Sequence, residues 1–373
     1  MTAHSDFWAT LARLKAELPA TGLKKIPLIA ADRWVLASGL QKSCRRGSEK
    51  LAASFALSLA HQDRRMLWRR LLVIAFEDVG MANPALVQEV ITAYKFPVVR
   101  RELGDAEIAV HLARKMAASV KSRFLTEMLF FADRSKEAAS TRKCVEKAGN
   151  RKLLNMILDP VRQPYERCLA IWALAGSKSY PAQGFKRAGN MELAAEALRQ
   201  LPAPSDLTEG SVAVMRDMRH PLPLFMPLAW EVFEQQKLHL RVQHERPLSS
   251  EEFEGVPAFA IDALYTRIGG SALRQLQKAI PALAGYSPAQ MGETLFFIEG
   301  ENIDKRLTSD VLDKFRVNSV HALMLDLGLD RQEYAVLTRI LTKHFSLYSE
   351  LRLQQLERSL YGSEPDLFSG ERE

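Results

Sequence analysis

Paired carboxylates and clustered arginines are the side chains of this sequence whose spacing suggests chemistry. Glu77 and Asp78 are adjacent, and carboxylates are ligands of the kind that Mg²⁺ binds. Adjacent residues at a helix end point in different directions, so we expect one of the two to cap a helix or pair with arginine and the other to face solvent. The pair therefore predicts a structural corner rather than a catalytic centre.

A second polar group precedes the glycine pair at 269–270 and consists of Asp262, Tyr265, Thr266 and Arg267. Asp262 and Thr266 are four residues apart, which places them on one face of a helix. The glycine pair favours a helix end, and Ser271 can cap the helix that follows. We interpret the group as an ion pair beside a helix stop, and a polar binding site is the alternative.

The histidines and cysteines form no recognisable metal or nucleophile motif. The eight histidines show neither H-x-x-x-H nor H-E-x-x-H spacing. Cys44, Cys144 and Cys168 are not closely spaced, which argues against a zinc site or disulfide framework and is typical of a reducing cytoplasm. We therefore expect no catalytic residue, metal or cofactor.

Positive charge is concentrated in the first half of the chain. Residues 1–200 hold 33 Lys and Arg against 19 Asp and Glu, whereas the remainder holds 18 against 25. A basic surface attracts a polyanion because its contacts release counterions, and the alternative is that these charges are the solvated faces of helices. The side chains proposed to contact nucleic acid are Lys42, Arg45, Arg46, Arg69, Arg70, Lys121 and Arg123.

The elements that must position these residues are helices. Apolar residues recur at three- and four-residue spacing, with almost no alternation of period two, so we predict an all-α multi-helix array. The expected elements used below are helices at 121–132, 164–175, 228–237 and 331–358, a linker at 202–206 and a short extended piece at 238–242. Prolines are expected to interrupt the chain before residue 228, at Pro221, Pro223 and Pro227. In the central stretch 66–91, a helix is expected to run into the acidic corner and end at Gly80. Asn83 as N-cap and Pro84 at the first helical position start the next helix.

The same central stretch carries a family resemblance. Its matching residues are Arg69, Arg70, Glu77, Asp78, Val79, Gly80, Asn83 and Pro84, with a K-S-x-R-x-G segment at 42–47 upstream and Lys121-Ser122 downstream. Residues 37–135 resemble the C-terminal, clamp-loader-like (collar) region of the replication-associated recombination ATPases of the AAA+ class, the RarA/MgsA type. That family also carries a G-x-x-x-x-G-K-(S/T) phosphate loop, and no such segment occurs in this sequence.

The resemblance implies a helical module that holds subunits together, detached from its ATPase engine. We expect an N-terminal helical extension at 1–36, a collar-like basic domain at 37–201, a C-terminal helical domain at 206–360 and a flexible tail at 361–373. The function expected is non-catalytic oligomerisation and binding of DNA or of a partner in replication, recombination or repair. An ATPase or replication protein in trans is a possible partner, and a nucleic-acid-processing enzyme with an unrecognised active site is the alternative.

The sequence favours a cytoplasmic protein without a membrane partner. No apolar run approaches the roughly 20 residues that a membrane-spanning helix needs. The first residues, which include His4 and Asp6, do not resemble a signal peptide. The DNA form that is bound and the number of subunits are not indicated by any motif.

Overall fold

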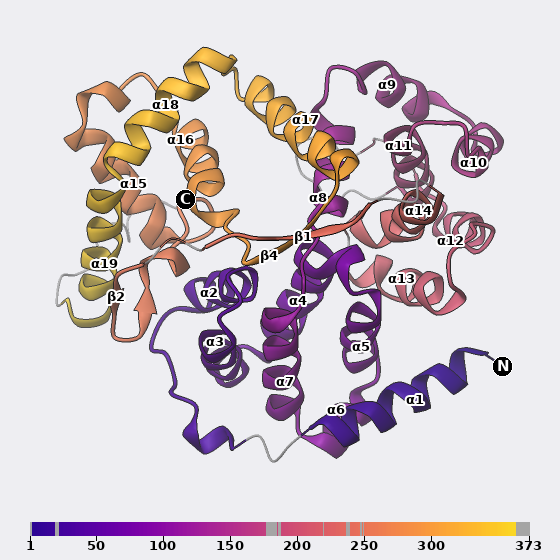
Figure 1. The fold of residues 1–373 in the computed structure, drawn as a ribbon, viewed down its shortest axis with the longest axis horizontal. Helices are drawn as coiled ribbons and strands as arrows, with labels where there is room; N and C mark the ends of the chain where they lie inside the picture. The colour runs from indigo at the N-terminus through magenta and orange to yellow at the C-terminus, as the bar shows by residue number, and fades with distance from the viewer. Residues whose placement is uncertain are drawn as a thin grey trace, which may run out of the picture.

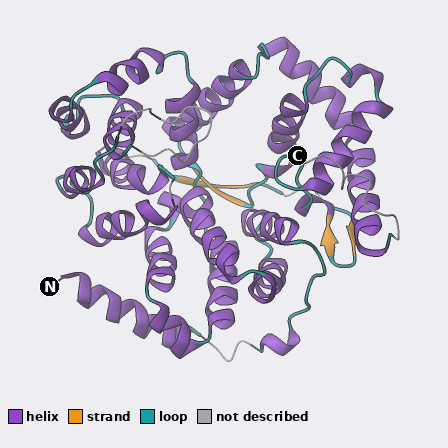
Figure 2. Ribbon diagram, turned by 180° about the vertical axis from the view of Figure 1, so that it is seen from behind, coloured by secondary structure: helices purple, strands orange, loops and turns teal. Residues whose placement is uncertain are grey.

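The computed structural model describes residues 2–18, 22–176, 185, 188–218, 220–235, 239–246, 248 and 250–362. Within these ranges the protein is an array of nineteen α-helices with two small sheets, which confirms the all-α prediction. Figure 1 shows three groups of helices around a central two-stranded ribbon. Figure 2 shows the same arrangement from behind, with helices on every side of the short strands.

The first group of helices contains the acidic corner. Its bounds are α1 Thr2–Glu17, α2 Arg33–Arg45, α3 Glu49–Gln62, α4 Arg64–Ile74, α5 Pro84–Lys95, α6 Pro97–Leu103 and α7 Asp105–Ala118, with the short helix η1 at Leu23–Lys25. α3 lies between α2 and α7. Its buried alanines, Ala52, Ala53 and Ala56, let these neighbours approach closely because a methyl group takes up little space.

The second group, upper right in Figure 1, follows directly along the chain. Its bounds are α8 Phe124–Arg134, α9 Ala139–Lys147, α10 Asn150–Leu158, α11 Pro164–Ala175, α12 Met191–Arg199, α13 Ser205–Met218 and α14 Leu222–Gln235. Two of the prolines expected to interrupt the chain before residue 228 instead lie within α14. Pro223 is in the first turn, where no backbone donor is needed, and only Pro227 costs the helix an internal hydrogen bond.

The third group is built from α15 Arg267–Ala279, α16 Pro288–Leu295, α17 Asp310–Asp326, α18 Arg331–Lys343 and α19 Phe345–Tyr361, with the short helices η4 Ala258–Ala260 and η5 Pro281–Leu283. α17 leaves this group and packs against α8 of the second. The long helix predicted for 331–358 is two helices, because the chain turns at His344. The tail from residue 363 onward lies outside the described residues.

Two short antiparallel sheets connect distant parts of the chain. Their bounds are β1 Arg241–His244, β2 Glu252–Phe253, β3 Val256–Pro257 and β4 Lys305–Thr308. β1 pairs with β4 so that Arg241 lies opposite Thr308, and β2 pairs with β3. The extended piece expected near 238–242 is therefore β1, shifted by a few residues. β4 also bridges to Lys121, which explains why α8 begins only at Phe124 and not at the predicted residue 121.

Buried apolar side chains form two cores. The larger extends from Leu11 on α1 to Val232 on α14 and takes in a few residues from 256–268, α17 and α19. The smaller lies among α15, α16, α17, α18 and α19. Side chains on both sides of the predicted linker at 202–206 belong to the larger core, and α12 contacts α13 there. The domain division at this linker remains a proposal.

The acidic corner adopts the predicted helix–corner–helix form. After α4 the chain makes one π turn, η2 Ala75–Val79, and one short turn, η3 Gly80–Ala82, before α5 begins. Gly80 has φ of 45°, and a Cβ there would lie 2.8 Å from the carbonyl oxygen of Ser122. Asn83 Oδ1 accepts a hydrogen bond from Leu86 N over 3.1 Å, which confirms the predicted N-cap.

Candidate functional site

Three basic residues singled out by the sequence lie at the C-terminal end of α2, and all three are buried. Lys42, Arg45 and Arg46 are 5%, 3% and 9% exposed. α3, α4 and α7 pack against α2, and η4 from the C-terminal part of the chain contacts it as well. Charged side chains on an enclosed helix must find partners within the protein, because burial of an unpaired charge is costly.

Asp78 is the acceptor at the centre of this cluster and has no solvent exposure. Arg45 Nε donates to Asp78 Oδ1 over 2.6 Å, and Arg123 Nη1 donates to the same oxygen over 2.9 Å. Gln41 Nε2 donates to Asp78 Oδ2 over 3.0 Å and to Glu77 Oε2 over 2.8 Å. The acidic corner thus forms the predicted ion pair with arginine, and the Glu77 side chain keeps 22% of its surface exposed.

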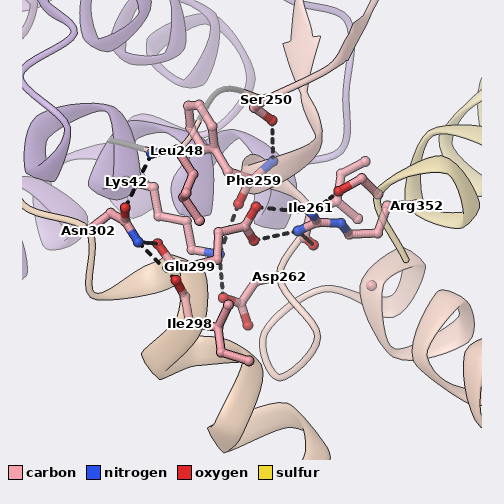
Figure 3. Close-up of polar contacts among 12 residues, drawn as sticks. Lys42, Leu248, Ser250, Phe259, Ile261, Asp262, Ile298, Glu299, Asn302 and Arg352 are labelled. Carbon is pink, nitrogen blue, oxygen red and sulfur yellow. Dashed lines mark hydrogen bonds and ion pairs between the residues drawn. The ribbon is translucent and has the colours of Figure 1, made fainter. Parts of the chain in front are cut away.

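Lys42 crosses from α2 to the C-terminal part of the chain. Its Nζ donates to Asp262 Oδ2 over 2.5 Å and to the Phe259 carbonyl oxygen over 2.9 Å, as Figure 3 shows. Burial lowers the pKa of Lys42. For Asp262, burial alone would raise the pKa, but the adjacent Lys42 charge outweighs it and the pKa is lowered. The attraction between the two charges opposes the effect of burial on the pKa of each partner.

A second buried pair extends this network to α19. Arg352 makes two hydrogen bonds to the Glu299 carboxylate, over 2.6 Å and 3.0 Å, and Figure 3 shows both residues beside Lys42 and Asp262. Glu299 lies in η6, Phe296–Gly300, a π turn like the one at the acidic corner. Arg46 donates to the carbonyl oxygens of Leu248 and Glu299 and lies over the Phe259 ring at 4.4 Å.

Lys121 and Arg123 hold the start of α8 against the segment that leads to β4. Lys121 Nζ donates to Asp304 Oδ1 over 2.6 Å, and Arg123 Nε pairs with Glu301 Oε1 over 2.9 Å. Arg306 on β4 also pairs with Glu301, and it pairs with Glu245, the residue that follows β1. These ion pairs join residues that are far apart in sequence, so they tie the first and second groups of helices to the third.

Five of the seven basic residues proposed for nucleic-acid contact are thus internal. Lys42, Arg45, Arg46, Lys121 and Arg123 are at most 9% exposed and bonded within the protein. A side chain enclosed in this way cannot reach a phosphate on the surface. Arg69 is exposed, whereas its neighbour Arg70 is half-buried and donates to Gln41 Oε1 over 2.7 Å. We therefore move the proposed contact with nucleic acid to the exposed face of α4.

The second polar group predicted from the sequence is divided by the fold. Asp262 is buried against Lys42, and Thr266 caps α15 by accepting a hydrogen bond from Gly269 N. The glycine pair lies within the first turn of α15, so the helix begins where it was predicted to end. Arg267 is exposed on the outside of α15, and Tyr265 is 65% exposed.

Side chains from all three groups of helices line a cavity of about 280 Å³, here called the junction cavity. Its basic lining residues are Lys42, Arg45, Arg70, Arg123 and Arg134, and its acidic ones are Glu77, Asp262 and Glu293. Trp34, Phe130, Tyr265 and Phe296 supply aromatic surface. Glu77 and Asp262 belong to different predicted motifs, and only the fold brings them to one cavity. Burial raises the pKa of Glu293.

A second, open depression lies along α4 and is here called the α4 groove. It measures about 790 Å³. Its six basic lining residues are Arg64, Arg65, Arg69, Lys95, Arg100 and Arg216, and its two acidic ones are Asp105 and Asp217. Lys95 pairs with Asp217 over 2.9 Å, and Arg100 pairs with Asp105 over 3.1 Å. Arg64, Arg65 and Arg69 are exposed and have no carboxylate within ion-pair distance among the described residues.

Sequence patterns did not identify Glu299, Glu301, Asp304 or Arg352 as parts of the network. Their partners lie far away along the chain, so no local spacing connects them. The one local signal is an acid before glycine at a helix end, in F-E-D-V-G at 76–80 and F-I-E-G at 297–300. Both segments form π turns, which are often found at functional positions in helices.

Two further observations concern metal binding and membrane-spanning helices. In the ranges that the structure describes, no group of three or more His, Cys, Asp or Glu side chains is arranged to hold a metal ion. None of the helices described is both long and apolar enough to cross a membrane.

Comparison with known proteins finds a family similarity in the central part of the chain. Residues 52–143 match the model of the MgsA AAA+ ATPase C-terminal region. The match begins within α3 and ends within α9, and it includes the acidic corner and the exposed face of α4. It does not include the segment around Lys42 and Arg45. No curated protein and no solved structure matches the chain significantly.

Proposed function

We propose that this protein is a non-catalytic helical module of an AAA+-type complex and contacts DNA through the α4 groove. The proposal depends on three exposed arginines that have no ion-pair partner among the described residues: Arg64, Arg65 and Arg69. They lie in a groove with six basic and two acidic lining residues. The groove belongs largely to the part of the chain that matches the MgsA-type C-terminal region. The proposed roles are in DNA replication, recombination or repair.

The charge of the α4 groove supports contact with a polyanion. Lys95, Arg100 and Arg216 are each paired with an acid, so their charges are largely compensated within the protein. Arg64, Arg65 and Arg69 are the groove's uncompensated charges. When these arginines contact DNA phosphates, the counterions condensed on the DNA are released. Each guanidinium can also donate two parallel hydrogen bonds to a phosphate. Such contacts bind DNA without reading its sequence.

Assembly is the second part of the proposal. A collar-type region acts by holding subunits together, so we propose that the protein forms a homo-oligomer or joins an ATPase or replication protein supplied in trans. Light scattering of the purified protein would give a defined multiple of the 42.0 kDa chain mass for a homo-oligomer. A monomer at all concentrations, with and without DNA, would contradict homo-oligomerisation. Partner binding would then be tested by mixing the protein with an AAA+ ATPase of the RarA/MgsA type.

The DNA-binding experiment compares two triple variants with the same change in charge. Arg64→Glu with Arg65→Glu and Arg69→Glu alters the α4 groove. Arg274→Glu with Lys278→Glu and Lys343→Glu alters exposed basic residues on α15 and α18 and serves as the control. Fluorescence anisotropy with a labelled duplex and a labelled single strand is measured from low to high salt.

We expect the α4 variant to bind at least about tenfold more weakly at low salt and to lower the slope of log K against log salt by about 2 to 3, since each phosphate contact contributes about 0.9. The control variant is expected to change binding by less than about threefold at about 0.1 M salt, where the Debye length is roughly 10 Å and distant charges are screened. Equal loss in both variants would mean that net charge alone attracts DNA. Magnesium-dependent cleavage of the probe would instead favour a nucleic-acid-processing enzyme.

A further inference from the structure

The junction cavity contains a positive charge that the protein does not neutralise. Arg70 lines it from α4, and its one hydrogen bond among the described residues goes to the neutral amide oxygen of Gln41. No carboxylate of the described chain lies within ion-pair distance of this guanidinium. Burial lowers the pKa of Arg70, which reflects the cost of holding an uncompensated charge there.

Two more guanidinium groups in the cavity wall keep donors that the protein does not use. Arg45 Nη2 lies 3.7 Å from Glu77 Oε2, beyond hydrogen-bond distance, while its Nε and Nη1 are bonded to Asp78 and Gly300. Arg134 pairs with Asp326 through Nη1 over 3.2 Å, whereas its buried Nε has no hydrogen-bond partner among the described residues and lies 3.7 Å from Asp133 Oδ2. Buried donors are normally satisfied, so Arg134 Nε is a donor that lacks an acceptor at hydrogen-bond distance.

The acidic residues of the wall do not supply that acceptor. Asp262 is already paired with Lys42, and Glu77 already accepts from Gln41. Burial raises the pKa of Glu293, because it makes the charged form of the carboxyl less favourable. The other three arginines of the cavity wall each pair with a carboxylate: Arg45, Arg123 and Arg134. Among the described residues, Arg70 is therefore the arginine of this wall whose charge has no ion-pair partner.

We propose that the junction cavity binds a small organic phosphate of up to about the size of a mononucleotide. Arg45, Arg70 and Arg134 approach from α2, α4 and α8, which suits a tetrahedral oxyanion better than a planar carboxylate. Trp34 is 47% exposed at the cavity, and with Phe130 and Tyr265 it offers a surface on which an organic ring can stack. The volume of about 280 Å³ limits the ligand to this size class.

Because the cavity is lined by all three groups of helices, the ligand would stabilise their junction. Binding to the folded state alone raises the melting temperature in proportion to the logarithm of ligand concentration above Kd. The site is separate from the α4 groove and does not depend on DNA binding there.

The test uses thymidine 5′-monophosphate, inorganic phosphate and thymidine as probes, followed by calorimetric titration and thermal melting of the full chain. Arg70→Gln removes the charge in the cavity, and Arg69→Gln, one residue earlier on α4 and exposed, is the matched control. Arg134→Gln removes a donor from a different helix and replaces Arg70→Gln as the test variant if Arg70→Gln does not fold. Far-UV circular dichroism shows whether each variant folds.

We expect the monophosphate to bind the wild type and to raise its melting temperature, with thymidine binding at least about tenfold more weakly. Arg70→Gln and Arg134→Gln should each weaken binding about tenfold or more, since each removes a charge-assisted hydrogen bond, and Arg69→Gln should change it less than about twofold. Conversely, Arg69→Gln should weaken duplex binding and Arg70→Gln should not.

Three results would overturn the proposal. They are no binding of either phosphate probe at millimolar concentration, equal binding of thymidine and its monophosphate, and equal losses in the Arg69→Gln and Arg70→Gln variants. A further arm compares an oligonucleotide with a 5′-phosphate and one with a 5′-hydroxyl. Binding that requires both the 5′-phosphate and Arg70 would support the site and identify a strand end, rather than a free metabolite, as the source of the phosphate.

Discussion

The ion pair at the acidic corner allows the strongest test of the fold's energetics. Asp78 and Glu77 are adjacent acids, but Asp78 has no exposure whereas the Glu77 side chain is 22% exposed. Asp78→Asn keeps the shape of the side chain and removes its charge. It leaves the guanidinium groups of Arg45 and Arg123 buried without their shared acceptor charge.

The expected cost follows from the contacts that are lost. Asp78 accepts two charge-assisted hydrogen bonds, over 2.6 Å and 2.9 Å, and each such bond contributes about 1.5 to 3 kcal/mol. Breaking a buried ion pair by removing one partner costs about 3 to 5 kcal/mol. We therefore expect Asp78→Asn to lower the free energy of unfolding by about 3 to 5 kcal/mol. Glu77→Gln is the control and should cost about 1 kcal/mol or less, because a partly exposed ion pair contributes little.

The assay is urea-induced unfolding, followed by far-UV circular dichroism and by tryptophan fluorescence. Coincidence of the two signals shows whether a single transition can be analysed, and otherwise the first transition is compared between variants. The reasoning would be refuted if Asp78→Asn cost no more than Glu77→Gln. That result would mean that solvent reaches the two arginines and compensates for the lost carboxylate.

Two further predictions concern the same region. Gly80→Ala should destabilise the protein by about 1 to 3 kcal/mol in the same urea assay, since alanine at φ of 45° is strained and its Cβ would lie 2.8 Å from Ser122 O. Glu127 on α8 is buried, and burial raises its pKa from 4.5 to about 7. The folded state therefore binds more protons than the unfolded state between these values, so Glu127 makes stability fall as pH rises through this window. Glu127→Gln should remove this loss and stabilise the protein at pH 8 by up to about 3 kcal/mol. If the variant is no more stable than the wild type at pH 8, the raised pKa of Glu127 is contradicted.

Much of the helical framework follows from local sequence. The acidic corner, its glycine and the Asn83 cap depend on contacts within a few residues, so their pattern is visible without the fold. α11 begins and ends at the predicted residues 164 and 175 because Pro164 and Gly176 mark its two ends. The resemblance of this region to the RarA/MgsA type is likewise supported by the family match at residues 52–143.

Two other local predictions failed, one because of a distant segment and one because of a helix cap. Residue 121 was expected to start a helix, but β4 pairs with it and keeps the backbone extended. The glycine pair at 269–270 was expected to end a helix, yet Thr266 caps a new one that passes through it. In each case the competing interaction comes from contacts or cap geometry that helix propensity does not include.

By itself, the sequence determined the helical class, the acidic corner and the concentration of basic residues in the first half of the chain, because these depend on residue type and short-range spacing. Only the tertiary structure decided which of those charges reach solvent. Arg69 and Arg70 are neighbours of the same type, but the 100° rotation per residue along α4 turns one outward and the other toward the junction cavity. Lys42, Lys121 and Arg123 are internal because acids from the C-terminal part fold over them, and long-range packing of this kind leaves no periodic signal in the sequence.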